Sequence, residues 1–231
     1  MDIIDNISLQ LSTDQILRAM GADPSIIQTR KPSIYTAACR ALETGQPLIK
    51  PAFAYKTYSV DRVVHNSIIL HGHQKITSPL ISKELKNAQR LTVFVCSIGD
   101  EIELLSRQTT EEDPMLSMAL DALGSTAVEQ LIIEICWGFE AEASSRSEFV
   151  SQPFGPGLEG WSVLDGQPAI FQLVNASSAG VQLSPSMLME PVKSASFILG
   201  FSKTPFRAGS TCEYCSLRET CRYRGNHIDA K

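Results

Sequence analysis

The chain has 231 residues, 43% of them hydrophobic, which is enough to fill the core of one ordinary domain. Its formal net charge of −5 argues against a nucleic-acid-binding surface, which needs a clustered excess of Lys and Arg. The sequence shows no apolar run of about 18 residues, as a membrane helix requires, and its first residues lack the basic-then-apolar order of a signal peptide. We therefore expect a cytoplasmic protein that binds neither nucleic acid nor a membrane.

The first 90 residues predict short helices followed by strands. Residues 47–82 are rich in β-branched and aromatic side chains, which favour extended structure. In chain order we expect a strand at 7–11, a helix from about Thr13 that is capped by Thr13 or Asp14 and stops at Gly21, a helix through 35–42 closed by Gly45, a strand at 67–70, and a short helix at 81–89.

A long helix in the middle of the chain gives the clearest signal. Pro114 stands at the favoured first helical position behind Asp113, and one apolar face then recurs over about seven turns. We expect Glu129 and Glu134 on this helix to be solvated or to bond a neighbouring strand. The other elements expected in this half are a strand at 91–96, a helix from 102, a helix capped by Asp165 that runs through 174, and strands at 181–183 and 196–199.

Residues 151–160 cannot be regular structure, because Pro153, Gly155, Pro156, Gly157 and Gly160 interrupt them, so we expect a defined loop. Glycines let a ligand approach the main chain closely, and the loop is therefore the first candidate for a binding surface. The residue that follows the loop, Trp161, suits a core anchor better than a ligand-stacking platform.

The six cysteines divide into two groups. Three are scattered in apolar surroundings, whereas Cys212, Cys215 and Cys221 form a C-x2-C-x5-C array. A reducing compartment with a metal site explains this division better than a disulfide framework. Thiolates at this spacing suit an iron–sulfur cluster, here expected as [4Fe–4S], or a zinc ion.

Three thiolates leave a fourth coordination position open, and the candidates are Cys96, Cys39, His227, a partner's side chain or an exogenous molecule. Cys96 is the fourth ligand that we predict. Zinc is the simpler metal for a chain end, but zinc ribbons usually pair two short knuckles and this sequence has one. An iron–sulfur cluster is therefore the first hypothesis and zinc the second.

From Leu91 onward the sequence resembles the reactivation (activation) domain of cobalamin-dependent methionine synthase and stand-alone proteins related to it. Three groups of segments carry the likeness: 95–99 with 120–125, the stretch 155–167, and 183–194. The resemblance implies an α+β fold with a twisted antiparallel sheet and flanking helices. It also implies three portions: residues 1–90 as an N-terminal part of the same domain, 91–204 as the activation-domain-like core, and 205–231 as an added cysteine-rich tail.

In that family the Pro-Gly loop lies where S-adenosylmethionine binds, so the resemblance implies a cofactor-binding role for Gly155, Pro156, Gly157, Gly160 and Trp161. The sequence departs from the family at two positions of this loop. The family has an Arg four residues before the loop glycine and a Tyr after it, and Pro153 and Leu158 stand there in this chain. Without a guanidinium the methionine carboxylate lacks its bidentate partner, which argues against S-adenosylmethionine as a ligand.

The function that the resemblance and the tail imply is an accessory role in corrinoid-dependent methyl transfer. The tail cluster would pass an electron to cobalt in a corrinoid protein or a cobalamin-binding methyltransferase. Two alternatives stay open. One is a methyltransferase component of methionine synthesis that uses a metal-activated thiol, and the other is a non-catalytic binding module with a structural zinc.

Overall fold

The computed structural model describes residues 2–4 and 7–221, and within them the chain builds a mixed fold around one large antiparallel sheet. This sheet has seven strands in the order β4-β3-β2-β5-β9-β6, with β1 also paired to β2, and β7 pairs with β8 in a small second sheet. The strands are β1 (Asp2–Ile4), β2 (Ala52–Val64), β3 (Ser67–Leu70), β4 (Gln74–Thr77), β5 (Arg90–Ser97), β6 (Phe149–Val150), β7 (Gln182–Leu183), β8 (Met189–Glu190) and β9 (Ser194–Ser202).

Seven α-helices and three short 3-10 helices surround the sheets in the described part of the chain. They are α1 (Thr13–Ala19), α2 (Pro24–Arg30), α3 (Pro32–Gly45), α4 (Pro79–Glu84), α5 (Glu101–Thr109), α6 (Pro114–Ser145), α7 (Val163–Leu173), η1 (Gln46–Leu48), η2 (Ala176–Ala179) and η3 (Thr211–Tyr214). The α+β architecture expected from the sequence is therefore confirmed.

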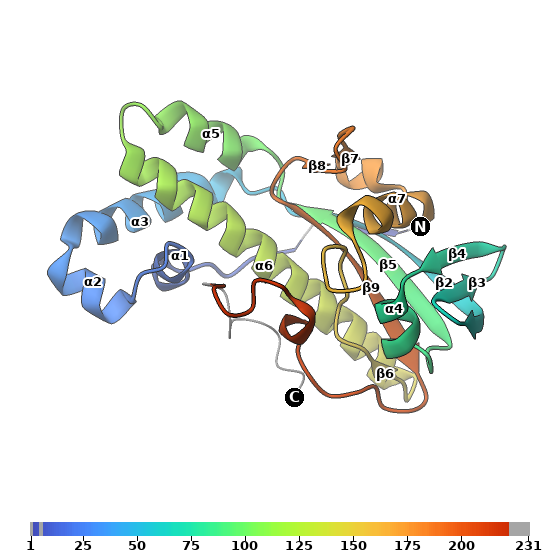
Figure 1. Ribbon diagram of the computed structural model, residues 1–231. Helices are drawn as coiled ribbons and strands as arrows, with labels where there is room; N and C mark the ends of the chain where they lie inside the picture. Colours follow the sequence, from blue (N-terminus) through green and yellow to red (C-terminus); the bar gives the residue numbers. More distant parts are fainter. Residues whose placement is uncertain (1, 5–6, 222–231) are drawn as a thin grey trace.

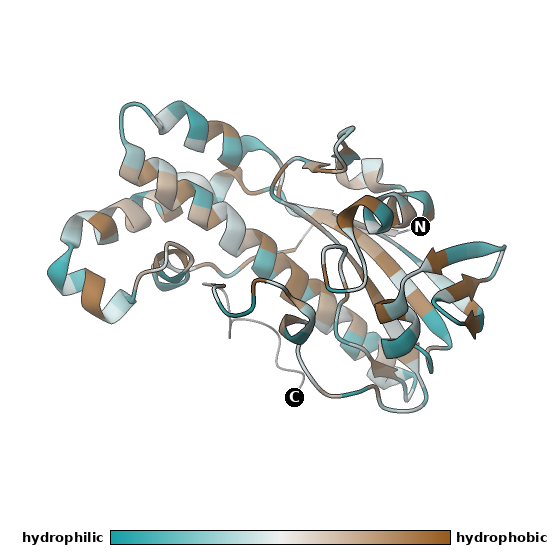
Figure 2. Ribbon diagram, viewed as in Figure 1, coloured by the Kyte–Doolittle hydropathy of each residue, from teal (hydrophilic) through white to brown (hydrophobic). Residues whose placement is uncertain are grey.

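The two faces of the large sheet are covered by different helices (Figure 1). On one face α6 lies against the strands, and α1, α3 and α5 pack on α6. On the other face α4, α7 and η2 pack with β3 and β4 over a second hydrophobic cluster. Figure 2 shows hydrophobic residues along the central strands and along α6, as expected where both faces of a sheet are buried.

Strand β5 lies at the centre of the sheet and contributes to both cores. Its side chains alternate, so that Phe94 and Cys96 point into the α6 layer while Val93 and Val95 point into the α7 layer. Cys96 pairs in register with Phe53 of β2 and with Ala195 of β9. Residues far apart in the sequence thus form one continuous core.

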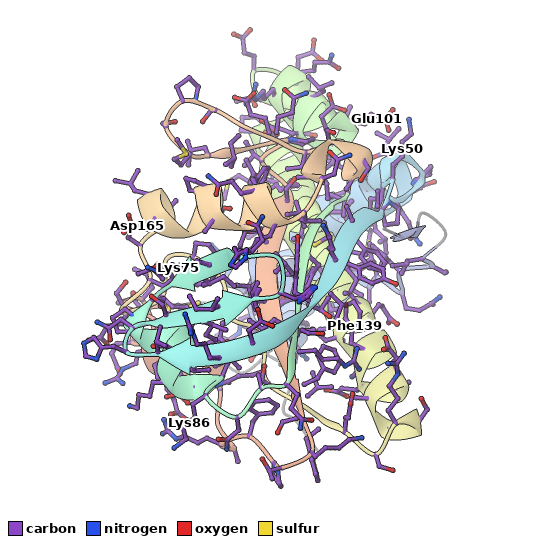
Figure 3. The ribbon with its side chains drawn as sticks, turned by 90° about the vertical axis from the view of Figure 1, so that its right-hand side faces the viewer. Lys50, Lys75, Lys86, Glu101, Phe139 and Asp165 are labelled. Carbon is purple, nitrogen blue, oxygen red and sulfur yellow. The ribbon has the colours of Figure 1, made fainter. Side chains whose placement is uncertain are left out.

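Helix α6 begins at Pro114, and the Asp113 side chain accepts a hydrogen bond from the backbone amide of Leu116 at 3.1 Å. Its 32 residues span about 48 Å at 1.5 Å per residue. Near the far end Phe139 anchors the helix to the sheet, with ring centroids 5.3 Å from Tyr55 and 6.1 Å from Phe201, both edge-on (Figure 3).

By length and composition alone α6 could cross a membrane, which corrects the expectation that no segment is long and apolar enough. Half of its most apolar window is buried inside the fold. Burial against the sheet and against the neighbouring helices accounts for this apolar character, because the core helix of a globular domain meets the same criteria.

Most of the predicted elements are confirmed, and the differences lie mainly at helix ends. Residues 7–11 form no strand, and α1 is capped by Ser12, which forms a capping box with Gln15. Similarly, Ser162 rather than Asp165 caps α7, and its hydroxyl oxygen accepts the amide hydrogen of Asp165 at 3.1 Å. A serine a few positions earlier supplies the cap in both helices, so the acidic residue falls inside the first turn.

Candidate functional site

The cysteine-bearing tail packs against the Pro-Gly loop. The backbone amide of Glu159 donates a hydrogen bond to the carbonyl oxygen of Tyr214 at 2.8 Å, and the Tyr214 ring lies 6.1 Å from the Phe154 ring. Burial, and then the nearby carboxylate of Glu84 in α4, raises the pKa of the Tyr214 hydroxyl. These contacts join η3 to the loop and to α4, so the tail forms part of the folded domain up to this point.

The loop itself is held by close packing at two glycines. A Cβ atom on Gly155 would lie 2.9 Å from the Phe197 ring and 3.1 Å from the Ser196 carbonyl oxygen. A Cβ atom on Gly166 in α7 would lie 2.7 Å from the Pro156 side chain and 2.9 Å from the Trp161 indole. The loop therefore seats directly on α7 and β9.

The five residues predicted to bind a cofactor fall into a buried set and an exposed set. Gly155 and Trp161 are buried, Pro156 is half-buried, and Gly157 and Gly160 are exposed with φ values of 101° and 84°. Trp161 is only 2% exposed, and its indole N–H is buried with no acceptor among the described residues. The loop therefore offers a ligand mainly the backbone around its two exposed glycines.

A pocket of about 470 Å³ lies beside this loop, and none of those five residues lines it. Its walls come from α6, from the chain leading into β9, from residues 152–153 and from the tail. Apolar side chains form most of the surface: Val128, Ile132, Ile133, Pro153, Val192 and Phe197. Small-molecule sites commonly have this size and this apolar character.

Polar groups reach this pocket from several segments, among them α6, the loop and the chain leading into β9. Oε1 of Glu129 and Oε1 of Gln152 are both buried without a hydrogen-bond partner, and both side chains line the pocket. Burial raises the pKa of Glu129 to about 7. Lys193 also lines the pocket, but its ammonium donates to Asp121 at 2.7 Å and to Ser125 at 2.9 Å.

Sequence reasoning missed the pocket position of Glu129, which it assigned to solvent or to a bond with a neighbouring strand, and it did not single out Gln152. The run Leu131, Ile132 and Ile133 offered a signal, because a helix that is apolar on more than one side is covered on more than one side. The sequence around Gln152 gives no sign that this residue lines a pocket, because its surroundings depend on the position of α6.

Two of the three tail cysteines, Cys215 and Cys221, line this same pocket. Cys212 lies in η3 and is half-buried. Among residues 2–4 and 7–221, no three His, Cys, Asp or Glu side chains are grouped as a metal site would require. His227, a candidate fourth ligand, lies outside the described residues.

The other two candidate ligands lie elsewhere in the fold. Cys96 is fully buried in β5, and burial, with a contribution from nearby Cys136, raises its pKa to about 12. Cys39 in α3 lies 3.8 Å from the Thr13 hydroxyl and lines a different pocket. Neither thiol lines the pocket that the tail cysteines reach.

No protein-family model and no curated protein matches the sequence. The fold does match a solved structure, the crystal structure of the MetH reactivation domain bound to AdoHcy, with a TM-score of 0.61. The match covers 87% of this chain and 78% of that chain at 13% sequence identity. At this identity the likeness shows the fold alone, so the chain has the fold of the MetH reactivation domain.

Proposed function

We propose that this chain is an accessory protein of corrinoid-dependent methyl transfer that reductively activates a corrinoid protein through an iron–sulfur cluster on its tail. The observation that carries the proposal is the attachment of a C-x2-C-x5-C tail to a reactivation-type fold, with Cys215 and Cys221 facing one apolar pocket. The fold supports the corrinoid context, since the solved domain belongs to MetH, and the thiols support the electron donor.

In the proposed reaction the chain takes one electron from a low-potential donor of the ferredoxin or flavodoxin class. The tail cysteines would hold the centre that passes this electron to cob(II)alamin on the partner, which would thereby be reduced to cob(I)alamin. Methyl transfer from S-adenosylmethionine to cob(I)alamin yields methylcobalamin and S-adenosylhomocysteine, and so makes the reduction irreversible. The AdoHcy in the solved domain supports this last step, whereas Pro153 at the family's Arg position favours a methyl donor bound elsewhere.

The donor set suits a soft metal centre, because three thiols stand within ten residues and every cysteine of the described chain is free. Binding would have to draw Cys212 toward Cys215 and Cys221, since these three are not grouped as a ligand set. The burial of Cys96 favours a fourth ligand from outside the core, such as His227, a partner's side chain or an exogenous molecule. Free thiols also support a reducing, cytoplasmic location.

Anaerobic purification tests the metal. The native chain is expected to be brown, with visible absorbance and, once reduced, a paramagnetic resonance signal of an iron–sulfur cluster. Replacing Cys212, Cys215 and Cys221 together by Ser should remove iron and colour, whereas the control Cys39→Ser should retain both. A colourless native protein that contains no iron contradicts the proposal.

A second experiment tests the electron transfer. The reduced protein is mixed with a corrinoid protein in the cob(II) state, and the cob(II) resonance signal is followed. We expect the signal to disappear with the native chain and to persist with the triple-serine variant. A cob(II) signal that persists while the tail centre is fully reduced contradicts reductive activation.

Structural zinc is the second candidate, and the packing of Tyr214 on Phe154 favours it because the tail is docked against the fold. A metal that only fastens the tail contributes folding energy directly. Elemental analysis would then give zinc, and chelation would lower the melting temperature without affecting any corrinoid reaction. Zinc with an open coordination position would instead favour a methyltransferase component that activates a thiol.

A further inference from the structure

We propose that the pocket between α6, β9 and the tail binds a small molecule with an apolar body that presents hydrogen-bond donors and carries no anionic group. This site goes beyond the proposed function, and the residues that support it are other than the tail cysteines. Three features of the pocket support it: its walls, its unpaired acceptors and its engaged lysine.

The walls favour an apolar or aromatic body. Val128 and Ile132 of α6 face the pocket together with Phe197 of β9, and Pro153 and Val192 add further apolar surface. The Phe197 ring is fixed from the other side, because it packs against Phe94 at 5.6 Å between centroids and against the backbone of Gly155. A volume of about 470 Å³ admits a molecule of one or two fused rings with a short polar arm.

The acceptors favour a donor-bearing ligand. Of the three buried, unpaired side-chain N or O atoms in the described chain, two are Oε1 of Glu129 and Oε1 of Gln152, both from pocket-lining side chains. A buried acceptor without a partner has lost its hydrogen bonds to water and gained none from the protein, so a ligand that supplies a donor is favoured there. The last torsion of Glu and Gln is soft, so both oxygens can turn toward a ligand that supplies N–H or O–H groups.

The charges around the pocket disfavour an anion. Lys193 lines the pocket, but Asp121 and Ser125 already hold its ammonium, and its side chain is only 12% exposed. Arg18 lies near Glu129 in a smaller, neighbouring pocket and does not line this one. A carboxylate or phosphate would therefore be desolvated beside Glu129, with no free cation among the pocket-lining residues of the described chain.

Three probes that share an indole body test this inference: indole-3-acetamide, tryptamine and indole-3-acetate, titrated calorimetrically into the native full-length chain. We expect indole-3-acetamide and tryptamine to bind, and indole-3-acetate to bind at least about tenfold more weakly, the equivalent of one lost hydrogen bond. Equal affinity for the acetate and the acetamide, or no binding by any probe, overturns the inference.

Matched variants locate the binding site. Glu129→Leu and Gln152→Leu should each weaken indole-3-acetamide about tenfold, whereas Glu134→Leu, on the same helix but outside the pocket lining, should not. Glu129→Gln keeps an acceptor oxygen but removes the carboxylate, so it should still bind indole-3-acetamide and should bind tryptamine more weakly. This variant replaces Glu129→Leu as the test if the leucine variant does not fold. Unchanged acetamide affinity in folded Glu129→Leu or Gln152→Leu overturns the assignment.

The triple-serine tail variant separates this inference from the proposed function. Serine is close to cysteine in size, so probe binding should persist when the metal is lost. If this variant no longer reduces the corrinoid but still binds the probes, the pocket assignment stands. If it still reduces the corrinoid but no longer binds the probes, the pocket assignment is wrong.

Discussion

The carbonyl oxygen of Tyr214 accepts a hydrogen bond from the backbone amide of Glu159 at 2.8 Å, which ties the cysteine-bearing tail to the Pro-Gly loop. The Tyr214 hydroxyl also accepts a hydrogen bond from Arg207 at 2.7 Å. One residue thus contacts the loop through its backbone and its ring, and it lies one position before Cys215. The tail cysteines are therefore positioned through Tyr214.

Replacing Tyr214 by Ala should release the tail, because the contact with the Phe154 ring is lost. We expect a local loss of about 1–2 kcal/mol and a rise of roughly 5- to 30-fold in the rate of tryptic cleavage at Arg207 and Arg218. The control Tyr214→Phe keeps the ring and loses only the interactions of the hydroxyl with Arg207 and Glu84, so its cleavage rate should change much less. Equal cleavage rates for both variants and the native chain would show that the ring does not hold the tail.

Replacing Gly166 by Ala should destabilise the fold by about 1–3 kcal/mol, because the new Cβ would overlap Pro156 and Trp161. Gly138→Ala is the matched control, since a Cβ atom on that helical glycine would meet nothing within 4 Å, and we expect it to stabilise by about 0.5–1 kcal/mol. Denaturant unfolding measures both changes. A Gly166→Ala variant as stable as the native chain would show that the loop does not pack tightly on α7.

The stability of the chain should depend on pH through Glu129. Its pKa is about 7 in the folded protein and lies near the ordinary value of 4.5 in the unfolded chain, so the folded state holds the proton more tightly. Its contribution is fully present below about pH 4.5 and is lost as the pH rises through about 7. The charged or titratable groups that line the pockets around it are Lys193, Arg18, Cys215 and Cys221.

Glu129→Gln should remove this dependence and should exceed the native chain in stability at pH 8 by about 1–2 kcal/mol, after allowance for partial solvent exposure. Urea unfolding at pH 5.5 and pH 8 measures the difference. Glu134 accepts a hydrogen bond from the Gln130 side chain at 2.9 Å. The control variant Glu134→Gln should therefore show the same dependence of stability on pH as the native chain. If the stability of Glu129→Gln depends on pH as strongly as that of the native chain, a group other than Glu129 causes the dependence.

Replacing Cys96 by Ala distinguishes the predicted fourth ligand from an external one. Cys96 is fully buried in β5 and does not line the pocket that Cys215 and Cys221 reach. We expect Cys96→Ala to retain its metal and to lose about 1 kcal/mol of stability, and Cys215→Ser to lose its metal. Loss of metal from a folded Cys96→Ala variant, measured by elemental analysis, would instead identify Cys96 as a ligand.

The elements whose signals are local could be predicted from the residues alone. Asp113 followed by Pro114 and a long apolar periodicity predicted α6, and the run 91–96 predicted β5, because caps and side-chain periods act within a few residues. The sequence also identified the cysteine array, since metal-ligand spacing is a property of neighbouring positions. Its errors at α1 and α7 came from two acceptable caps a few positions apart, between which the local sequence decides weakly.

The surroundings of each residue, in contrast, depend on how the whole chain packs. Glu129 and Gln152 come from different elements, and the burial of their oxygens depends on how α6 crosses the sheet and where the tail returns. The separation of Cys96 from Cys215 likewise follows from the pairing of β5 between β2 and β9, which turns that thiol into the core. Burial and the convergence of distant residues arise from packing, which a local pattern does not encode.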